Sequence, residues 1–179
     1  MMKMKSKLMT ALAAAVLVSA TVVASAAPPA QQRTMDKVHK ELVTLPYYGV
    51  FDNLAYKVEG DTVTLYGQVR TPITRHDAER RVARIEGVEH VINQIEVLPV
   101  SGFDDSIRGR AYRAVFRSGS LYRYAMGANP SIHIVVKNGN VTLEGVVSSQ
   151  MDSQLAYMAA RGVSGVFSVT NNLRVGSGS

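Results

Sequence analysis

Apolar and polar residues alternate in two pairs of short segments, first at positions 54–69 and again at positions 132–147. A period of two places every second side chain on one face, which is typical of a half-buried strand. The segments of each pair are joined by a turn, Glu59-Gly60-Asp61 or Asn138-Gly139-Asn140, and Asn-Gly is a strong hairpin signal. The pattern therefore predicts two β-hairpins whose core-facing residues are Leu54, Tyr56, Val58, Val63, Leu65, Val69, Ile132, Ile134, Val136, Val141, Leu143 and Val147.

Apolar residues at helical spacing flank each hairpin. The helix predicted before each hairpin has its apolar side at Met35, Val38, Leu42 and Leu45, or at Ile107, Ala111, Ala114 and Val115. The helix predicted after it has Ala78, Val82 and Ile85, or Leu155, Ala156, Ala159, Ala160 and Val163. A third strand is predicted at positions 91–97 and 169–175.

The chain carries an internal duplication. Sliding the sequence along itself by 78 residues aligns Gly60–Val97 with Asn138–Val175 without a gap, with V-T-L-x-G-x-V in both copies. Self-similarity at a fixed period indicates repeated structural units. The predicted fold class is therefore α+β, with two tandem α-β-β-α-β units, each a small three-stranded mixed sheet packed by two helices. We expect domains at residues 33–98 and 103–175, a linker at 99–102 and a flexible tail at 176–179.

Four glycines recur in register and are predicted to be structural. Gly67 and Gly145 lie among the inward-facing residues of a strand, where a missing side chain is expected to let the following helix approach the sheet. Gly87 and Gly165 follow the second helices and are expected to form left-handed helix caps.

The first residues have the pattern of a secretory signal peptide. Three lysines precede the apolar run Leu8–Ala24, and Ala24-Ser25-Ala26 is a cleavage signal. We expect removal of residues 1–26, with cleavage near Ala26, and an exported protein. The alternative is a short membrane anchor, for which the run is brief.

Composition narrows the range of partners. The chain has no cysteine, which excludes disulfides and thiolate metal sites. The net charge of +6 includes the three lysines of the predicted signal, so the expected mature protein is only mildly basic. This gives little support for a nucleic-acid partner.

No arrangement of residues typical of catalysis is found in the sequence. His39, His76, His90 and His133 are scattered, so we expect solvated histidines and no metal site. The pair Asp104-Asp105 precedes Ile107 and is interpreted as an N-cap that also opposes the helix dipole. We predict a protein that is not an enzyme and has no cofactor and no small-molecule substrate.

Basic residues are concentrated in one segment of the second unit. Residues 31–98 carry nine basic and ten acidic side chains, whereas residues 99–179 carry eight and four. The predicted helix and the following loop, Ser118–Pro130, are expected to bind anionic lipid headgroups or an envelope protein. The candidate binding residues are Arg108, Arg110, Arg113, Arg117, Leu121, Tyr122, Arg123 and Tyr124. The alternative is a solvated arginine face with tyrosines packed on the neighbouring unit.

The repeated motifs resemble the BON family. The hairpin N-G-x-V-x-L-x-G-x-V stands at Asn138–Val147, and G-V-x-x-V-x-N-x-L-x-V stands at Gly165–Val175. The first copy is looser, with Gly60-Asp61 where the family prefers Asn-Gly. The tandem layout is similar to periplasmic, osmotically inducible members, and the resemblance implies a non-enzymatic envelope protein, often proposed to contact phospholipid membranes.

Two functional hypotheses follow from these features. The first is an exported protein for envelope maintenance or stress protection that contacts anionic phospholipid. The second is a soluble periplasmic chaperone-like protein for osmotic stress, which would bind other proteins through an exposed apolar patch around Pro46–Phe51.

Overall fold

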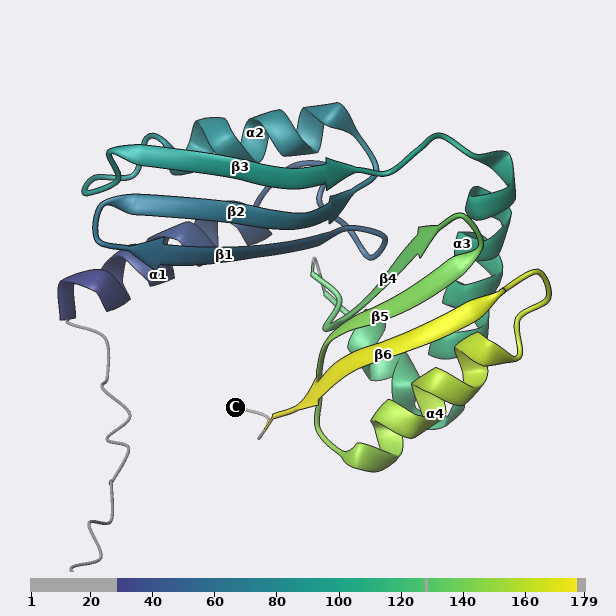
Figure 1. Ribbon diagram of the computed structural model, residues 1–179. Helices are drawn as coiled ribbons and strands as arrows, with labels where there is room; N and C mark the ends of the chain where they lie inside the picture. Colours follow the sequence, from purple (N-terminus) through teal and green to yellow (C-terminus); the bar gives the residue numbers. More distant parts are fainter. Residues whose placement is uncertain (1–28, 128, 177–179) are drawn as a thin grey trace, which may run out of the picture.

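The computed structural model describes residues 29–127 and 129–176 of the chain. The predicted signal peptide and the last three residues of the predicted tail lie outside this range. The chain forms two units of the same design, which confirms the predicted α+β class and the tandem arrangement (Figure 1). The first unit consists of α1 (Pro29–Val43), β1 (Asn53–Glu59), β2 (Thr62–Val69), α2 (Pro72–Val82) and β3 (His90–Val97).

The second unit repeats this order with one addition. It consists of α3 (Gly102–Phe116), a 3-10 helix η1 (Gly119–Ala125), β4 (Ile132–Lys137), β5 (Asn140–Val147), α4 (Gln150–Arg161) and β6 (Ser168–Val175). The added η1 occupies the segment predicted to be a loop. Its apolar side chains Leu121 and Tyr124 are 0% and 7% exposed and belong to the core of the unit. The extra segment is therefore part of the folded interior.

Each unit has a mixed three-stranded sheet, as predicted. The hairpin strands β1 and β2 pair antiparallel, and β3 joins β2 in parallel. The sheet of β4, β5 and β6 has the same order and the same register. Leu65 therefore pairs with Asn93 in one sheet, and Leu143 pairs with Asn171 in the other.

Helices cover one face of each sheet and leave the other face open. In the first unit Val38, Ala78 and Val82 from the helices are buried against Val63 and Leu65. The corresponding cluster in the second unit joins α3, η1 and α4 to β4 and β5. Alternation in the strands sends the remaining side chains to the opposite face, which carries no helix (Figure 1). These open faces are where polar side chains gather.

The repeated asparagines connect the third strand to the second helix of each unit. Asn93 donates to the carboxylate of Glu79 at 2.9 Å, and Asn171 donates to the hydroxyl of Ser153 at 2.9 Å. In both cases the side-chain oxygen accepts from the backbone N–H two residues on. Their recurrence is therefore explained by the fold.

The reason proposed for Gly67 and Gly145 is wrong, although their role is structural. Gly67 has φ +113°, and a Cβ there would lie 2.1 Å from the backbone oxygen of Asn53. Gly145 has φ +121°, and its Cβ would lie 2.0 Å from the oxygen of Ser131. The close neighbour is the backbone of the paired hairpin strand rather than a helix.

Gly87 and Gly165 have positive φ but do not cap the helices. The caps of α2 and α4 are Ala83 and Gly162, both in the right-handed helical region. The two glycines come several residues later, with φ of +89° and +86°, in the turn that leads to the third strand. Left-handed backbone is thus required at the sheet entry, where glycine adopts it without strain.

The acids before Ile107 do not provide the N-cap of α3. That role belongs to Ser101, whose hydroxyl accepts from the backbone N–H of Asp104. Asp104 lies in the first turn of α3 and is fully buried, and its carboxylate accepts from the backbone N–H groups of Asn138 and Gly139 at 2.9 and 2.8 Å. Asp104 therefore attaches the β4–β5 turn to α3. Its negative charge also lies in the first turn of the helix, where the helix dipole favours it.

Candidate functional site

Three of the residues predicted to contact lipid are buried. Arg108 is 4% exposed and donates to the backbone oxygen of Val136 and to the carboxylate of Asp105, both at 2.7 Å. Leu121 and Tyr124 belong to the core. These three residues are not available to a membrane surface, so their prediction as lipid-binding residues is wrong.

Arg123 is half-exposed and tied to the start of α4. Its guanidinium lies 2.6 Å from the carboxylate of Asp152 and also donates to the hydroxyl of Tyr124. The hydroxyl of Ser149 donates to the same carboxylate, and this bond lowers the pKa of Asp152. The hydrogen bonds from Tyr124 and Ser148 and the charge of Arg123 shift the pKa in the same direction. Arg123 therefore fastens η1 to α4 and leaves only part of its side chain for another partner.

The arginines of α3 that face outward form an exposed stripe. Arg110, Arg113 and Arg117 follow a spacing of three and four residues, which places them on one side of the helix. Arg113 and Arg117 are exposed, and Arg110 is half-buried beside the turn at Gly165. We call the outer surface of α3 and α4, which carries these arginines, the helical face of the second unit.

Exposed apolar side chains occur on α3, on α4 and on the segments next to these helices. Phe103 in α3 is 48% exposed and contacts Phe167, which is 74% exposed, at a ring-centroid distance of 5.8 Å. Met151 and Met158 of α4 are 78% and 69% exposed, and Tyr122 of η1 is 61% exposed. Large apolar groups beside unopposed basic groups are typical of surfaces that enter the headgroup region of a membrane.

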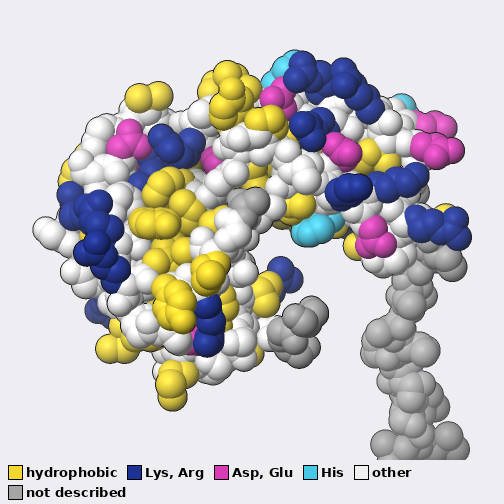
Figure 2. All heavy atoms as spheres, turned by 180° about the vertical axis from the view of Figure 1, so that it is seen from behind, with side chains coloured by type: hydrophobic (Ala, Val, Ile, Leu, Met, Phe, Trp, Pro, Cys, Tyr) yellow, Lys and Arg dark blue, Asp and Glu magenta, His cyan; other side chains and the backbone are white. Residues whose placement is uncertain are grey.

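Charge on this face differs from charge on the first unit. Arg80 and Arg81 of α2 pair with Asp77 and Glu41, whereas Arg75 and Arg84 of the same unit make no ion pair among the described residues. Within residues 29–127 and 129–176, no carboxylate lies within ion-pair distance of the α3 stripe or of Arg161 on α4. Figure 2 shows the same contrast, with Lys and Arg side chains in a column on the α3 side and basic and acidic groups interspersed over the first unit.

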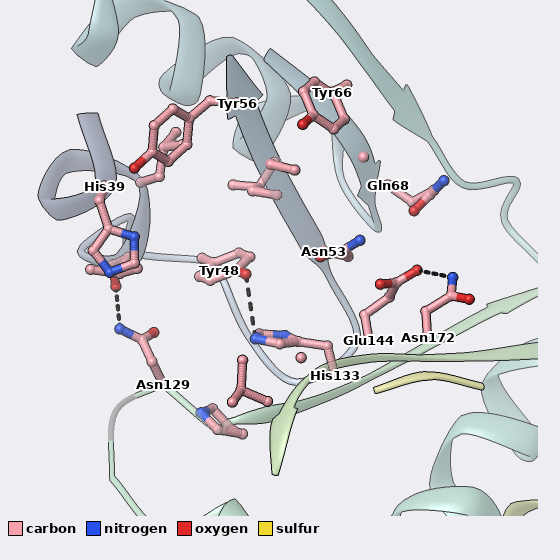
Figure 3. A pocket seen from close by; sticks show the side chains of 18 of the residues that line it. His39, Tyr48, Asn53, Tyr56, Tyr66, Gln68, Asn129, His133, Glu144 and Asn172 are labelled. Carbon is pink, nitrogen blue, oxygen red and sulfur yellow. Dashed lines mark hydrogen bonds between the residues drawn. The ribbon is translucent and has the colours of Figure 1, made fainter. Parts of the chain in front are cut away.

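A second feature, a cleft between the two units, was not predicted from the sequence. It has a volume of about 1070 Å³ and is lined by the open faces of both sheets, together with α1 and the segment before β4. Figure 3 shows Asn53, Tyr66 and Gln68 of the first unit opposite His133, Glu144 and Asn172 of the second. The only sequence signal for it was the alternation itself, which assigns these side chains to a face without helices.

The two walls of the cleft are joined by the segment between α1 and β1. The backbone oxygen of Val50 accepts from the N–H of Ile134 at 2.7 Å, and Val50 and Phe51 pack against the core of the second unit. The predicted apolar patch is therefore largely an internal contact, and within it only Pro46 and Tyr47 are exposed. Asn129 adds a bond to the backbone oxygen of Val43 at 2.7 Å.

The buried carboxylate of Asp52 shapes this joining segment. It accepts from the backbone N–H of Arg70 at 2.6 Å and from that of Gly49 at 3.0 Å. Burial raises the pKa of Asp52, and these two backbone bonds oppose the shift. The loop before β1 is thus tied to the end of β2, which presents Val50 to β4.

His133 belongs to the joint between the units, so the prediction of a solvated histidine is wrong for this residue. Its Nδ1 lies 3.2 Å from the oxygen of Gly49, and its Nε2 lies 3.4 Å from the hydroxyl of Tyr48. A carbonyl oxygen only accepts, so Nδ1 carries the proton and Nε2 accepts from Tyr48. Burial raises the pKa of Tyr48 to about 12, which keeps that hydroxyl protonated. His39, His76 and His90 are exposed, as expected.

The half-buried position of His133 predicts a loss of stability in mild acid. Burial lowers its pKa, and the bonds to the loop and the charges of Asp52 and Glu144 only partly oppose the shift. The unfolded state therefore takes up a proton as the pH falls below about 6.5 while the folded state stays neutral. Stability is expected to fall by up to about 1.4 kcal/mol per pH unit until the lowered folded pKa is reached.

Thermal melting between neutral and mildly acidic pH checks this expectation. A His133→Gln variant should lose most of the pH dependence, because glutamine does not titrate. The exposed His39 is the matched control, and His39→Gln should keep the slope of the wild-type chain. An unchanged slope in His133→Gln would contradict the role of His133. The raised pKa of Asp52 acts in the opposite direction and is present in all three proteins.

The described part of the chain has neither a cluster of metal ligands nor a helix suited to span a membrane. Within the described ranges there is no group of three or more His, Cys, Asp or Glu residues that would hold a metal ion. In the same part of the chain, no helix combines the length and apolar character needed to cross a bilayer.

Comparison with known proteins supports the resemblance seen in the motifs. The family model described as BON domain matches twice, at residues 36–99 and 104–177. The C-terminal domain of CdsD, the structural protein of the type III secretion system of Chlamydia trachomatis, is similar with 10% identity and a TM-score of 0.32, over 79% of this chain and 96% of that chain. A second CdsD structure has 10% identity and a TM-score of 0.33, over 82% and 93%. A comparison with curated proteins gave no match. Scores this low support no conclusion about function.

Proposed function

The chain belongs to the BON domain family, with two tandem BON domains, and on that basis we propose that it is an exported, non-enzymatic protein of the cell envelope. Its role in this proposal is envelope maintenance or stress protection, in the periplasm, after cleavage of the signal peptide near Ala26. It contacts anionic phospholipid peripherally through the helical face of the second unit.

The observation that supports this proposal is the exposed α3 stripe, which has no carboxylate within ion-pair distance in residues 29–127 and 129–176. Arg113 and Arg117 are exposed, and Arg161 extends the basic surface onto α4. A guanidinium binds phosphate through two parallel hydrogen bonds, which an ammonium group does not provide. Each basic residue near an anionic membrane contributes about 1 kcal/mol. The exposed residues Phe103, Phe167 and Tyr122 supply the apolar groups that enter the interface.

Co-sedimentation with liposomes rich in anionic phospholipid tests the proposal. We expect binding at low salt that weakens as salt screens the charges. The triple variant Arg110→Gln, Arg113→Gln, Arg117→Gln should bind about a hundredfold more weakly, because three contributions of about 1 kcal/mol are lost. Absence of binding by the wild-type chain at low salt would rule out the lipid contact.

A matched control separates local contact from net charge. Arg75→Gln, Arg80→Gln and Arg84→Gln remove the same three charges from exposed positions in and after α2. This variant should bind nearly as well as the wild-type chain. Equal weakening in the two triple variants would point to net charge alone. Suppressed aggregation of an unfolding client protein, unaffected by either triple change, would instead favour the chaperone-like hypothesis.

A further inference from the structure

The cleft between the units has the size and composition of a ligand site. Its volume of about 1070 Å³ is slightly above the usual range for small-molecule sites, about 300–1,000 Å³, which leaves room for a ligand of several sugar units. It lies on the open side of the second sheet, whereas the helical face lies on the other side. We propose that this cleft binds a neutral oligosaccharide. The proposal is independent of the lipid contact.

Amide side chains supply the polar groups on the first wall. Asn53, Gln68 and Gln94 point from three adjacent strands into the cleft. Within the described part of the chain, the side-chain amides of these three residues make no hydrogen bond to protein, whereas the side chain of Asn172 on the opposite wall donates to Glu144 at 2.7 Å. An amide offers donors and an acceptor in one plane, which matches sugar hydroxyls that both donate and accept.

A tyrosine ring lies among these amides. Tyr66 precedes Gln68 on the same face of β2 and is 44% exposed, although its ring is large and apolar (Figure 3). An exposed ring beside hydrogen-bonding groups suits a ligand that has both C–H and hydroxyl surfaces. A pyranose has this character, because its axial C–H groups form an apolar face and its hydroxyls lie at the rim.

Charge in the cleft disfavours an anionic ligand. Arg174 is the only lysine or arginine among the lining residues that the structure describes, and Glu96 and Glu144 are also present. Glu96 of the first unit forms an ion pair with Lys137 of the second unit, and Glu144 accepts a hydrogen bond from Asn172. The lining therefore has no excess of positive charge to attract phosphate, in contrast to the helical face. A neutral, hydroxyl-rich ligand fits it better.

The form of the walls also disfavours an extended peptide. Peptides that add to a sheet use the backbone groups of an edge strand. Here one edge bond, from Ile134 of β4 to Val50, is already made within the chain, and the lining combines the edge strand β1 with side chains from both sheet faces. The joint at His133 and Asn129 holds the two walls together, so the site is formed before a ligand arrives.

Titration with tetra-N-acetylchitotetraose, cellotetraose and maltotetraose, followed by NMR of the purified protein, tests this proposal. We expect at least one of the three to bind at millimolar concentration or below and to shift resonances of β2, β3 and β5. Tyr66→Ala should weaken binding about tenfold, because one stacking ring is lost. Tyr66→Phe keeps the ring and should stay within about twofold of the wild-type affinity. The double variant Gln68→Ala, Gln94→Ala should also weaken binding about tenfold, since two hydrogen-bonding side chains are removed.

The control is Tyr122→Ala, which removes an exposed tyrosine of η1 outside the cleft and should leave the affinity unchanged. The proposal is overturned if none of the three sugars binds at millimolar concentration. It is equally overturned if binding persists in both Tyr66→Ala and the glutamine double variant, or if the cleft binds an unstructured hexapeptide and no sugar.

Discussion

Replacing Gly145 by valine is expected to unfold the second unit. The first atom of any side chain at this position would lie 2.0 Å from the backbone oxygen of Ser131, and φ is +121°. A β-branched residue is strongly disfavoured at such a backbone angle. Strain and overlap together should cost at least about 3 kcal/mol, which lowers the melting temperature by about 15 °C or more in a domain of this size. Thermal melting followed by circular dichroism measures the change.

Two comparisons separate overlap from backbone strain. Gly145→Ala should already produce most of the loss, because the colliding atom is the first side-chain carbon. Gly60→Ala is the matched control, since Gly60 has φ +62° with no atom within 4 Å of the added carbon. Only the backbone cost, about 1 kcal/mol, is expected there. Normal melting of Gly145→Val together with a specific loss of ligand binding would mean that this glycine serves a site instead.

The fold could be predicted from the sequence because its determinants are local and occur twice. The alternation through Val63 and Leu65 recurs at Val141 and Leu143, and each copy supports the interpretation of the other. The asparagines aligned at 93 and 171 make equivalent bonds within their own units. Contacts inside a unit are therefore visible as a repeated pattern.

The contacts between the units occur once and leave no repeated pattern. Val50 meets Ile134 across 84 positions of sequence, and no periodicity marks either residue as a partner of the other. The cleft depends on that joint, so no pattern in the sequence marks its lining residues as one site. Likewise, Ser118–Pro130 was predicted to be a loop, and no pattern indicated that part of it packs into the core. In a 3-10 helix, residues three apart lie on one side, which brings Leu121 and Tyr124 together into the core.

Arg108 shows how a site prediction based on residue type fails. It was grouped with the other arginines because all of them occur in one short segment. Its position relative to Asp104, Ala111 and Val115 places it on the buried side of α3, at spacings of four, three and seven residues. Helical position was therefore the available signal. The burial of a charge depends on a partner such as the oxygen of Val136, which comes from another element.

Replacing Asp104 by alanine is expected to destabilise the second unit nearly as much as the glycine change. The carboxylate accepts from two backbone N–H groups in the β4–β5 turn, where Asn138 and Gly139 have φ of +50° and +75°. Without it both donors lose their partner, at about 1–3 kcal/mol each. We expect a loss of about 3 kcal/mol in the free energy of unfolding, measured by urea denaturation. Asp61→Ala, at an exposed acid in the matching turn of the first unit, should cost less than about 0.5 kcal/mol. If the two variants lose similar stability, the carboxylate of Asp104 does not hold the turn, and its burial would have to be explained by the helix dipole alone.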